Sequence, residues 1–375
     1  MRDLRSGVPA AAAVVVMASA AFFLTSPAGY AQGVSCTGIN TNVPHNETAE
    51  PPEIEACEQL QGTELAETAV VGAAAPSAQA AGFGAVRAQT LAVTNAISER
   101  IRAISRDLAR GLGSAASRPA EATYRGIAAG SPDSRWGVWG DASGSFLRDN
   151  ASVGYNGPSV VALAGADYIL APDWIVGFSS GYTHANLALR SITGSRASNG
   201  AVVAPYASYI LSPNLSLDGQ FNYTRLSNNV METGPGPSSA FGSNRLTGAV
   251  NLNGYFDIGP IKLTGFTGYT YSWEGSSKTV LSNVPPFSDN LHYGVFRVGG
   301  EAGYQFEQFE AYVPLTFEYE TTRPQDGTSR AALVVGAGLR YQWGDQLKAG
   351  FLATTSQLKT HWQDVKLEAN LRWTF

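Results

Sequence analysis

Apolar and polar residues alternate strictly along the C-terminal end of the chain. Val365, Leu367 and Ala369 stand at every second position, and Lys366 and Glu368 lie between them. Because the side chains of a β-strand point alternately to its two faces, this segment predicts a strand with one apolar face and one polar face.

The same alternation recurs upstream and predicts twelve strands in all. The predicted strands are 136–146, 159–170, 174–187, 199–211, 215–227, 243–257, 261–273, 291–306, 309–321, 330–343, 347–358 and 363–375. The connections between them alternate between short turns and longer polar loops. The short turns are 171–173, 212–214, 258–260, 307–308 and 344–346. The last connection, 359–362, is short although its place in the order belongs to the long loops.

An even number of strands, with short turns at one end and long loops at the other, is typical of outer-membrane β-barrels. We therefore predict an all-β fold, a 12-stranded antiparallel transmembrane β-barrel over residues 135–375. Its turns and both of its ends are expected in the periplasm. A soluble sandwich is the alternative, although such a fold does not require connections that alternate so strictly in length.

Aromatic residues gather near the ends of the predicted strands, where the interfacial girdles of a membrane barrel lie. They are Trp136, Trp174, Tyr209, Trp273, Tyr341, Trp343 and Trp373. The polar positions of the predicted strands, which alternate with the apolar ones, predict the lining of a polar lumen that contains both acids and bases. The predicted lumen charges are Asp141, Asp167, Asp218, Arg245, Lys262, Arg297, Glu301, Glu310, Glu318, Arg340, Lys348, Lys366, Glu368 and Arg372.

Residues 85–112 are predicted to form an amphipathic helix. Ile97, Ile101, Ile104 and Leu108 repeat at spacings of four, three and four, which makes one apolar stripe. The helix is rich in arginine. Its arginines are Arg87, Arg100, Arg102, Arg106 and Arg110.

At 1.5 Å per residue the predicted helix spans about 40 Å, but its charges exclude a position in lipid. We expect it in the polar lumen. There its arginines would meet the carboxylates of Asp141, Asp167, Asp218, Glu301, Glu310 and Glu318. An amphipathic helix in the periplasm or at the surface is the alternative. Residues 113–134, rich in Gly, Ser, Ala and Pro, are predicted to be a linker.

The N-terminus is typical of a secretory signal peptide. A basic start and an apolar run precede the small residues Gly29 and Ala31, so cleavage is expected after Ala31. An uncleaved anchor and a lipidated Cys36 are the alternatives. Residues 32–84 form a short polar segment in which Ala69–Gly84 is expected to be flexible. Its Cys36 and Cys57 predict a disulfide, because an even cysteine count in an exported chain favours pairing.

Composition narrows the function further. Charged residues make up 15% and the net charge is −5, which argues against nucleic acid as a partner. His184 and His292 share the parity of the lipid-facing residues, while His45 and His361 lie outside the strands. No histidine–acid dyad therefore lines the predicted lumen, and metal-ligand spacings and phosphate loops are absent. We expect neither an enzyme nor a cofactor.

The layout resembles the C-terminal translocator domain of autotransporters, the type V secretion proteins of Gram-negative bacteria. The terminal Leu371-x-Trp373-x-Phe375 and the opening Trp136-Gly137-Val138-Trp139-Gly140 are similar to that family, and the resemblance covers residues 85–375. It implies a barrel in outer-membrane lipid that transports an upstream passenger. It also implies that periplasmic chaperones and the barrel-assembly machinery act on it, the latter recognising Leu371, Trp373 and Phe375.

Two departures from the family pattern affect this interpretation. The passenger-like segment 32–84 is short for an adhesin or protease passenger, so the barrel is expected to be the main product. The linker 113–134, of about 22 residues, is also longer than a helix packed straight onto the barrel would need. In addition, the helix contains no Asn-Asn pair, which gives no support for self-cleavage. A small-solute outer-membrane channel and a structural or adhesive surface protein are the alternative functions.

Overall fold

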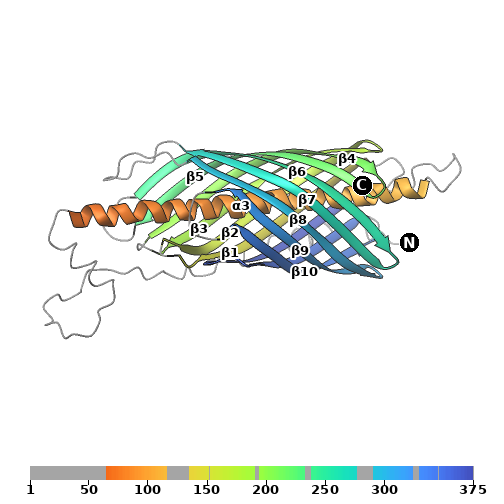
Figure 1. Ribbon diagram of the computed structural model, residues 1–375. Coiled ribbons are helices and arrows are strands. Elements are labelled where there is room, and N and C mark those ends of the chain that lie inside the picture. The colour runs from red at the N-terminus through yellow and green to blue at the C-terminus, as the bar shows by residue number, and fades with distance from the viewer. Residues whose placement is uncertain are drawn as a thin grey trace, which may run out of the picture.

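Antiparallel strands close into a barrel around one long helix in the computed structural model (Figure 1). The structure describes residues 65–115, 135–151, 153–190, 194–232, 238–276, 290–323, 329–344 and 346–374. The predicted signal peptide, both cysteines, most of the predicted linker and Phe375 lie outside these residues. Within the described part, twelve strands form the closed sheet.

Each predicted strand corresponds to one strand of the structure, so the predicted fold class is confirmed. The strands are β1 (Trp136–Asp149), β2 (Tyr155–Ala171), β3 (Trp174–Leu189), β4 (Gly194–Ser212), β5 (Leu215–Glu232), β6 (Ser238–Ile258), β7 (Ile261–Ser276), β8 (Asn290–Phe306), β9 (Phe309–Thr322), β10 (Ala331–Trp343), β11 (Leu347–Gln357) and β12 (Trp362–Thr374). Several strands run further into the long connections than predicted, because the ladder continues there beyond the apolar band.

Neighbours in sequence pair throughout the sheet, and β1 closes the ring by pairing with β12. The closing ladder runs from Gly137 opposite Thr374 to Asp149 opposite Trp362. Large apolar side chains cover the outer surface and are about half exposed, such as Phe178 at 52% and Leu315 at 51%. This apolar outer wall is suited to hydrocarbon, while the other parity of each strand faces inward.

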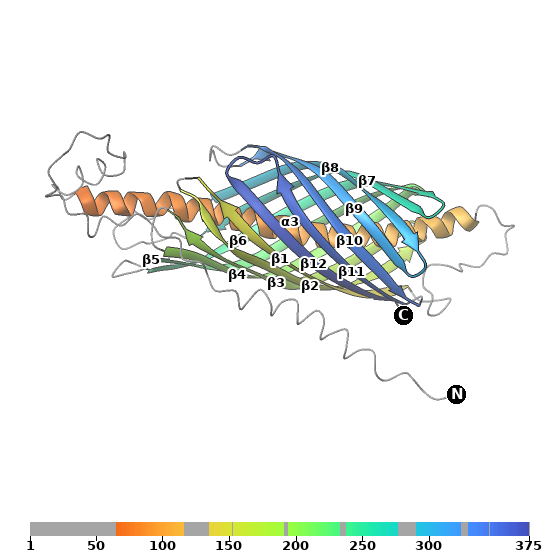
Figure 2. The same cartoon turned by 90° about the horizontal axis from the view of Figure 1, so that it is seen from below.

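The helix α3 (Leu65–Ala115) passes through the barrel and extends beyond it at both ends (Figure 2). Its place in the lumen rules out the alternative position in the periplasm or at the surface. The helix predicted at 85–112 is too short, because α3 comprises 51 residues. No helix in the described part of the chain is both long enough and apolar enough to cross a membrane.

The early start of α3 has a local cause. Residues 69–84, expected to be flexible, are rich in alanine, which is the strongest helix former. Gly82 and Gly84 lie where Arg196 and Tyr155 press against the helix, so that a Cβ atom at either glycine would collide with them. At the other end Gly111 does not stop the helix, since a helical glycine costs only about 1 kcal/mol.

We predict that Gly84→Val weakens the seating of α3 in the barrel. The added side chain would collide with the buried Tyr155 ring, and such overpacking costs about 1–3 kcal/mol. Single-channel recordings in planar bilayers should show more frequent openings than for the unmodified protein. Gln79→Val, at an exposed position of the same helix, is the matched control, and equal opening frequencies in the two variants would contradict the prediction.

Candidate functional site

The candidate functional site is the lumen, where α3 lies closer to one wall than to the other. The Cα trace of α3 comes within 8 Å of strands β1 to β8. Among the described residues it does not come that close to β9, β10, β11 or β12. Side chains on those four strands must therefore bridge a wider gap to reach the helix.

The near wall is mostly apolar and is formed mainly by β2, β3 and β4. The predicted stripe on α3 packs there: Ile97 and Ile101 are fully buried in one cluster with Leu163 and Val202. Further along the helix, Leu108 is buried with side chains of β3 and β4. Small residues such as Ala81 and Ala96 let the helix backbone approach the sheet closely.

A buried ion pair lies within this near wall. Arg100 donates from Nε to Asp167 Oδ2 at 2.7 Å, and its Nη2 also contacts that oxygen. The other carboxylate oxygen of Asp167 accepts from the Tyr206 hydroxyl, which itself accepts from Trp139 Nε1 at 2.8 Å. Arg100 and Asp167 are 7% and 3% exposed, so their charges are neutralised by each other rather than by water.

A second cluster joins α3 to the far wall near the long loops. Arg87 Nε lies 2.7 Å from Glu320 Oε1, and its Nη2 lies 3.6 Å from Glu318 Oε2. The Arg87 guanidinium also stacks on the Trp362 ring at 3.7 Å. Lys359 Nζ contributes a further contact to Glu320 at 2.5 Å.

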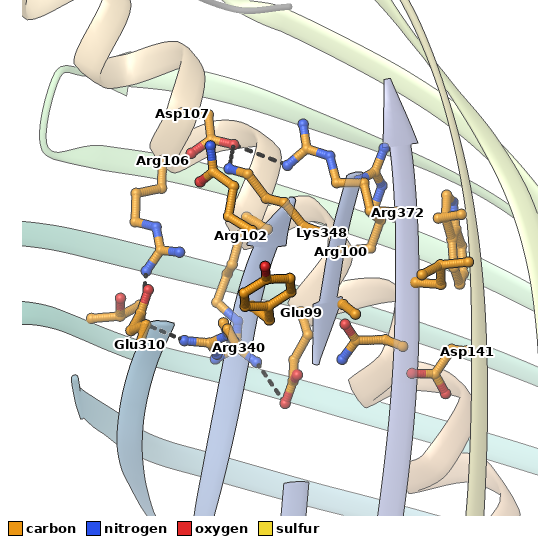
Figure 3. Close-up of a pocket in the computed structure, with 18 of the residues that line it drawn as sticks. Glu99, Arg100, Arg102, Arg106, Asp107, Asp141, Glu310, Arg340, Lys348 and Arg372 are labelled. Atoms are coloured by element: carbon orange, nitrogen blue, oxygen red, sulfur yellow. Dashed lines mark hydrogen bonds and ion pairs between the residues drawn. The ribbon is translucent and has the colours of Figure 1, made fainter. Parts of the chain in front are cut away.

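The third cluster lies near the short turns, and here the helix supplies the acid (Figure 3). Asp107 Oδ2 accepts from Arg372 Nη1 at 2.9 Å and from Lys348 Nζ at 3.1 Å. Beside it, Arg106 Nη1 lies 3.9 Å from Glu310 Oε1. The helix therefore supplies the base to some ion pairs with the barrel and the acid to others.

Polar side chains complete the contact between helix and barrel. Gln220 Nε2 donates to the Thr94 carbonyl and to Ser98 Oγ, both at 2.9 Å. Arg245 Nη1 donates to Gln89 Oε1 at 3.0 Å, while its Nη2 pairs with Glu274 at 2.8 Å. These bonds fix the rotation of the helix as well as its depth.

The predicted partners of the helix arginines are only partly brought together. Asp167, Glu310 and Glu318 meet Arg100, Arg106 and Arg87. The other three predicted acids lie against residues on other strands of the barrel instead of α3. Asp218 accepts from Asn251 and Asn253. Glu301 pairs with Arg340 at 2.5 Å. The buried Asp141 lies diagonal to Glu368 on β12.

The remaining predicted charges have varied surroundings. Arg102 lies over the Phe266 ring at 4.5 Å and 4.0 Å from Glu99 on the same helix. Arg297 donates to Asn95 of α3. Two predicted lumen lysines pair within the barrel: Lys366 with Glu368 at 2.5 Å, and Lys262 with Asp257 at 3.2 Å. The side chain of Arg110 lies outside the described part of the chain.

Sequence reasoning missed several charged residues of the lumen in the described part of the chain, among them Arg196, which donates to the Ala78 carbonyl of α3. Glu320 lies two positions after Glu318 on the same strand and therefore faces inward as well. Glu274 lies one residue beyond the predicted end of its strand, so a longer strand would have included it. Lys359 lies in the connection before β12, where no alternation indicates the direction of a side chain.

Beside α3, the described part of the chain encloses small cavities of about 150 Å³ and 110 Å³. Charged side chains such as Glu99, Arg102 and Glu301 line them, so each has the size and polarity to contain a few waters. His184 and His292 lie on the outward parity, bonded to Asn199 and Tyr271. No cluster of acid, histidine and cysteine side chains suited to a metal ion occurs among the described residues.

Comparison with protein families matches residues 138–354 to the model described as "Autotransporter beta-domain". A comparison with curated protein sequences finds no match.

Solved structures of translocator domains share the fold. The chain is similar to the beta domain of the Bordetella autotransporter BrkA, with 17% identity and a TM-score of 0.56 over 64% of this chain and 100% of that chain. The chain is also similar to the translocator domain of NalP from Neisseria meningitidis, with 12% identity and a TM-score of 0.57 over 76% of this chain and 97% of that chain. For the transport unit of AIDA-I from Escherichia coli the identity is 11% and the TM-score is 0.52, over 72% of this chain and 99% of that chain.

We predict that Asp167→Asn loosens α3 and increases pore conductance in planar bilayers. The change leaves the Arg100 charge buried without its counter-ion, which costs about 3–5 kcal/mol. Combining it with Arg100→Gln should restore part of the closure. Asp257→Asn, in the more exposed pair with Lys262, should change the free energy of seating α3 in the barrel by less than about 1 kcal/mol. Conductance of Asp167→Asn no higher than that of Asp257→Asn would rule out this role.

Proposed function

The chain belongs to the autotransporter family through its beta-domain, and from this we propose that its barrel exports the residues preceding α3 and displays them on the cell surface. The barrel is an outer-membrane β-barrel of the autotransporter type. Barrels of this family serve transport and secretion rather than catalysis. The displayed residues, the partners and the site roles given below are parts of our proposal.

The direction of α3 through the barrel is the observation that supports this function best. Arg87, towards the start of the helix, pairs with Glu320 near the long-loop end of β9. Asp107, towards its end, pairs with Lys348 near the turn that begins β11. Because long loops are extracellular and short turns periplasmic in such barrels, residues before Leu65 would leave the lumen on the outside.

The proposed domain organisation follows from this direction. Residues 1–31 serve as a cleaved signal peptide, and residues 32–64, with a Cys36–Cys57 disulfide, are the displayed segment. The helix α3 replaces the predicted 85–112 helix as the lumen plug. The residues between α3 and β1 return the chain to the barrel wall on the periplasmic side.

Assembly is proposed to depend on the end of β12. Leu371 and Trp373 stand on the outward face of this strand, opposite Gly140 and Val138 of β1, and Trp373 is 46% exposed. Together with Phe375 they would be read by the barrel-assembly machinery after periplasmic chaperones deliver the chain. Outer-membrane lipid would then surround the apolar wall.

The rival function of a small-solute channel requires an open bore. In the described part of the chain α3 occupies the lumen, and the cavities beside it are of about 150 Å³ and 110 Å³. A helix bound by ion pairs at three levels, two of them buried, is suited to keeping the barrel closed after export.

Protease access on whole cells tests the proposed display. A cleavage site placed between residues 61 and 64 should be cut in intact cells, because this segment would lie outside. The matched control is the same site placed within residues 116–134, which should be cut only after the outer membrane is permeabilised. Protection of the first site in intact cells would refute surface display.

We also predict that Trp373→Ala lowers the fraction of folded barrel in membranes severalfold, measured by heat-modifiable migration. Trp343→Ala is the control, since Trp343 is also outward at the turn end and is 63% exposed, yet lies on β10. A loss that is equal in the two variants would show that Trp373 serves only as a girdle residue.

A further inference from the structure

Two arginines on the outside of the barrel converge on a single asparagine. Arg148 Nε and Arg190 Nη1 both donate to Asn150 Oδ1, at 2.9 Å and 2.5 Å. All three side chains are exposed. The neighbouring Asp149 has the opposite parity and is buried. Within the described residues no carboxylate pairs with either guanidinium, so two positive charges lie side by side with only a neutral oxygen between them.

This arginine pair lies just above the apolar band of the barrel. The outward residues of β1 from Trp136 to Phe146 are apolar or glycine. At about 3.3 Å per residue and a tilt of about 40°, that stretch covers about 25 Å of membrane, the height of the apolar band. Arg148 is the next outward residue towards the long loops. The guanidiniums therefore lie at the level of the outer-leaflet headgroups.

An apolar hollow of about 540 Å³ opens on the outer wall below the arginine pair. Its outward lining is small or aliphatic apart from one aromatic ring. This lining includes Ala142, Gly144, Val160, Phe351, Ala353 and Leu367. Gly144 lies about 13 Å along β1 from Arg148 at ~3.3 Å per residue, and the volume is within the range of about 300–1,000 Å³ for small-molecule sites.

We propose that the arginine pair binds the phosphate of a phosphorylated outer-leaflet glycolipid of the lipid A type, and that one of its acyl chains lies in the hollow. A phosphate accepts several charge-assisted bonds and would neutralise the repulsion between Arg148 and Arg190. Asn150 positions both guanidiniums before the lipid arrives. The inference rests on the outer-membrane location alone and not on export of any segment.

A lone outward arginine elsewhere provides a comparison. Arg225 on β5 donates to Asn244 Oδ1 at 2.8 Å, an oxygen that also accepts from the Tyr223 hydroxyl. It therefore has the same kind of neutral partner, but the second guanidinium is missing. If phosphate binding needs the pair, then Arg225 contributes little to it.

The test is a titration of the purified full chain in detergent with lipid A, followed by native mass spectrometry. The double variant Arg148→Gln/Arg190→Gln should bind lipid A at least about tenfold more weakly, because two charge-assisted bonds are lost. Arg225→Gln should stay within about twofold of the unmodified protein. Heat-modifiable migration confirms that each variant is folded. Equal losses in the two variants would overturn the paired site.

Two further ligands separate the phosphate from the acyl chain. Removing the phosphates from lipid A should weaken its binding to the unmodified protein. The loss should equal the loss that the double substitution causes in the binding of intact lipid A. Inorganic phosphate alone should bind far more weakly than lipid A. Ala353→Trp, which fills the hollow, should weaken the binding of lipid A and leave the binding of inorganic phosphate unchanged. Tight binding of dephosphorylated lipid A, or no effect of Ala353→Trp on lipid A, would overturn the proposal.

Discussion

The pairing of β1 with β12 is the interaction on which the rest of the structure depends. Hydrocarbon offers no partner for a backbone N–H or C=O, and each unpaired group there costs several kcal/mol. The ladder from Gly137–Thr374 to Asp149–Trp362 removes the last two free edges of the sheet. Once the ring is closed, strand parity alone decides which side chains meet lipid and which meet the lumen, so the apolar wall and the polar interior are consequences of closure.

The charges of the lumen determine position more than stability. Buried ion pairs offset most of their own desolvation cost and are weak evidence for stability. Their placement, however, is directional: Arg87 meets acids near the long loops, whereas Asp107 meets bases near the turns. A helix threaded in the opposite direction would set like charges against each other. The lumen charges therefore select one orientation of α3, in which its N-terminal end lies towards the long loops.

The strands could be predicted from the sequence because period-two alternation is a local property of each segment. The helix was harder to predict. Ile97 and Ile101 define an apolar stripe, but the Ala- and Gly-rich stretch before them lacks one. Its alanines favour a helix, but no local pattern indicates that Tyr155 and Arg196, which lie far along the sequence, pack against it.

The lumen charges show the same division between what is local and what is not. Parity correctly assigns Glu318 to the inside, and the same rule extends to Glu320. The partner of each charge depends on the rotation and depth of α3 instead. Alternation within a strand contains no information about either, so Arg340 rather than a helix arginine meets Glu301.

The unequal packing of α3 against its two walls has a mechanical consequence. On the β2–β4 side, small residues interlock with the sheet at backbone distance, and such packing resists sliding because a shift to the next equivalent seat requires a full turn of about 5.4 Å. On the β9–β12 side, Arg87, Arg106 and Lys348 act as tethers with several rotatable bonds each. Thermal displacement of the helix should therefore be a rocking motion about its stiff contact with β2–β4, with the compliant tethers absorbing the change in distance.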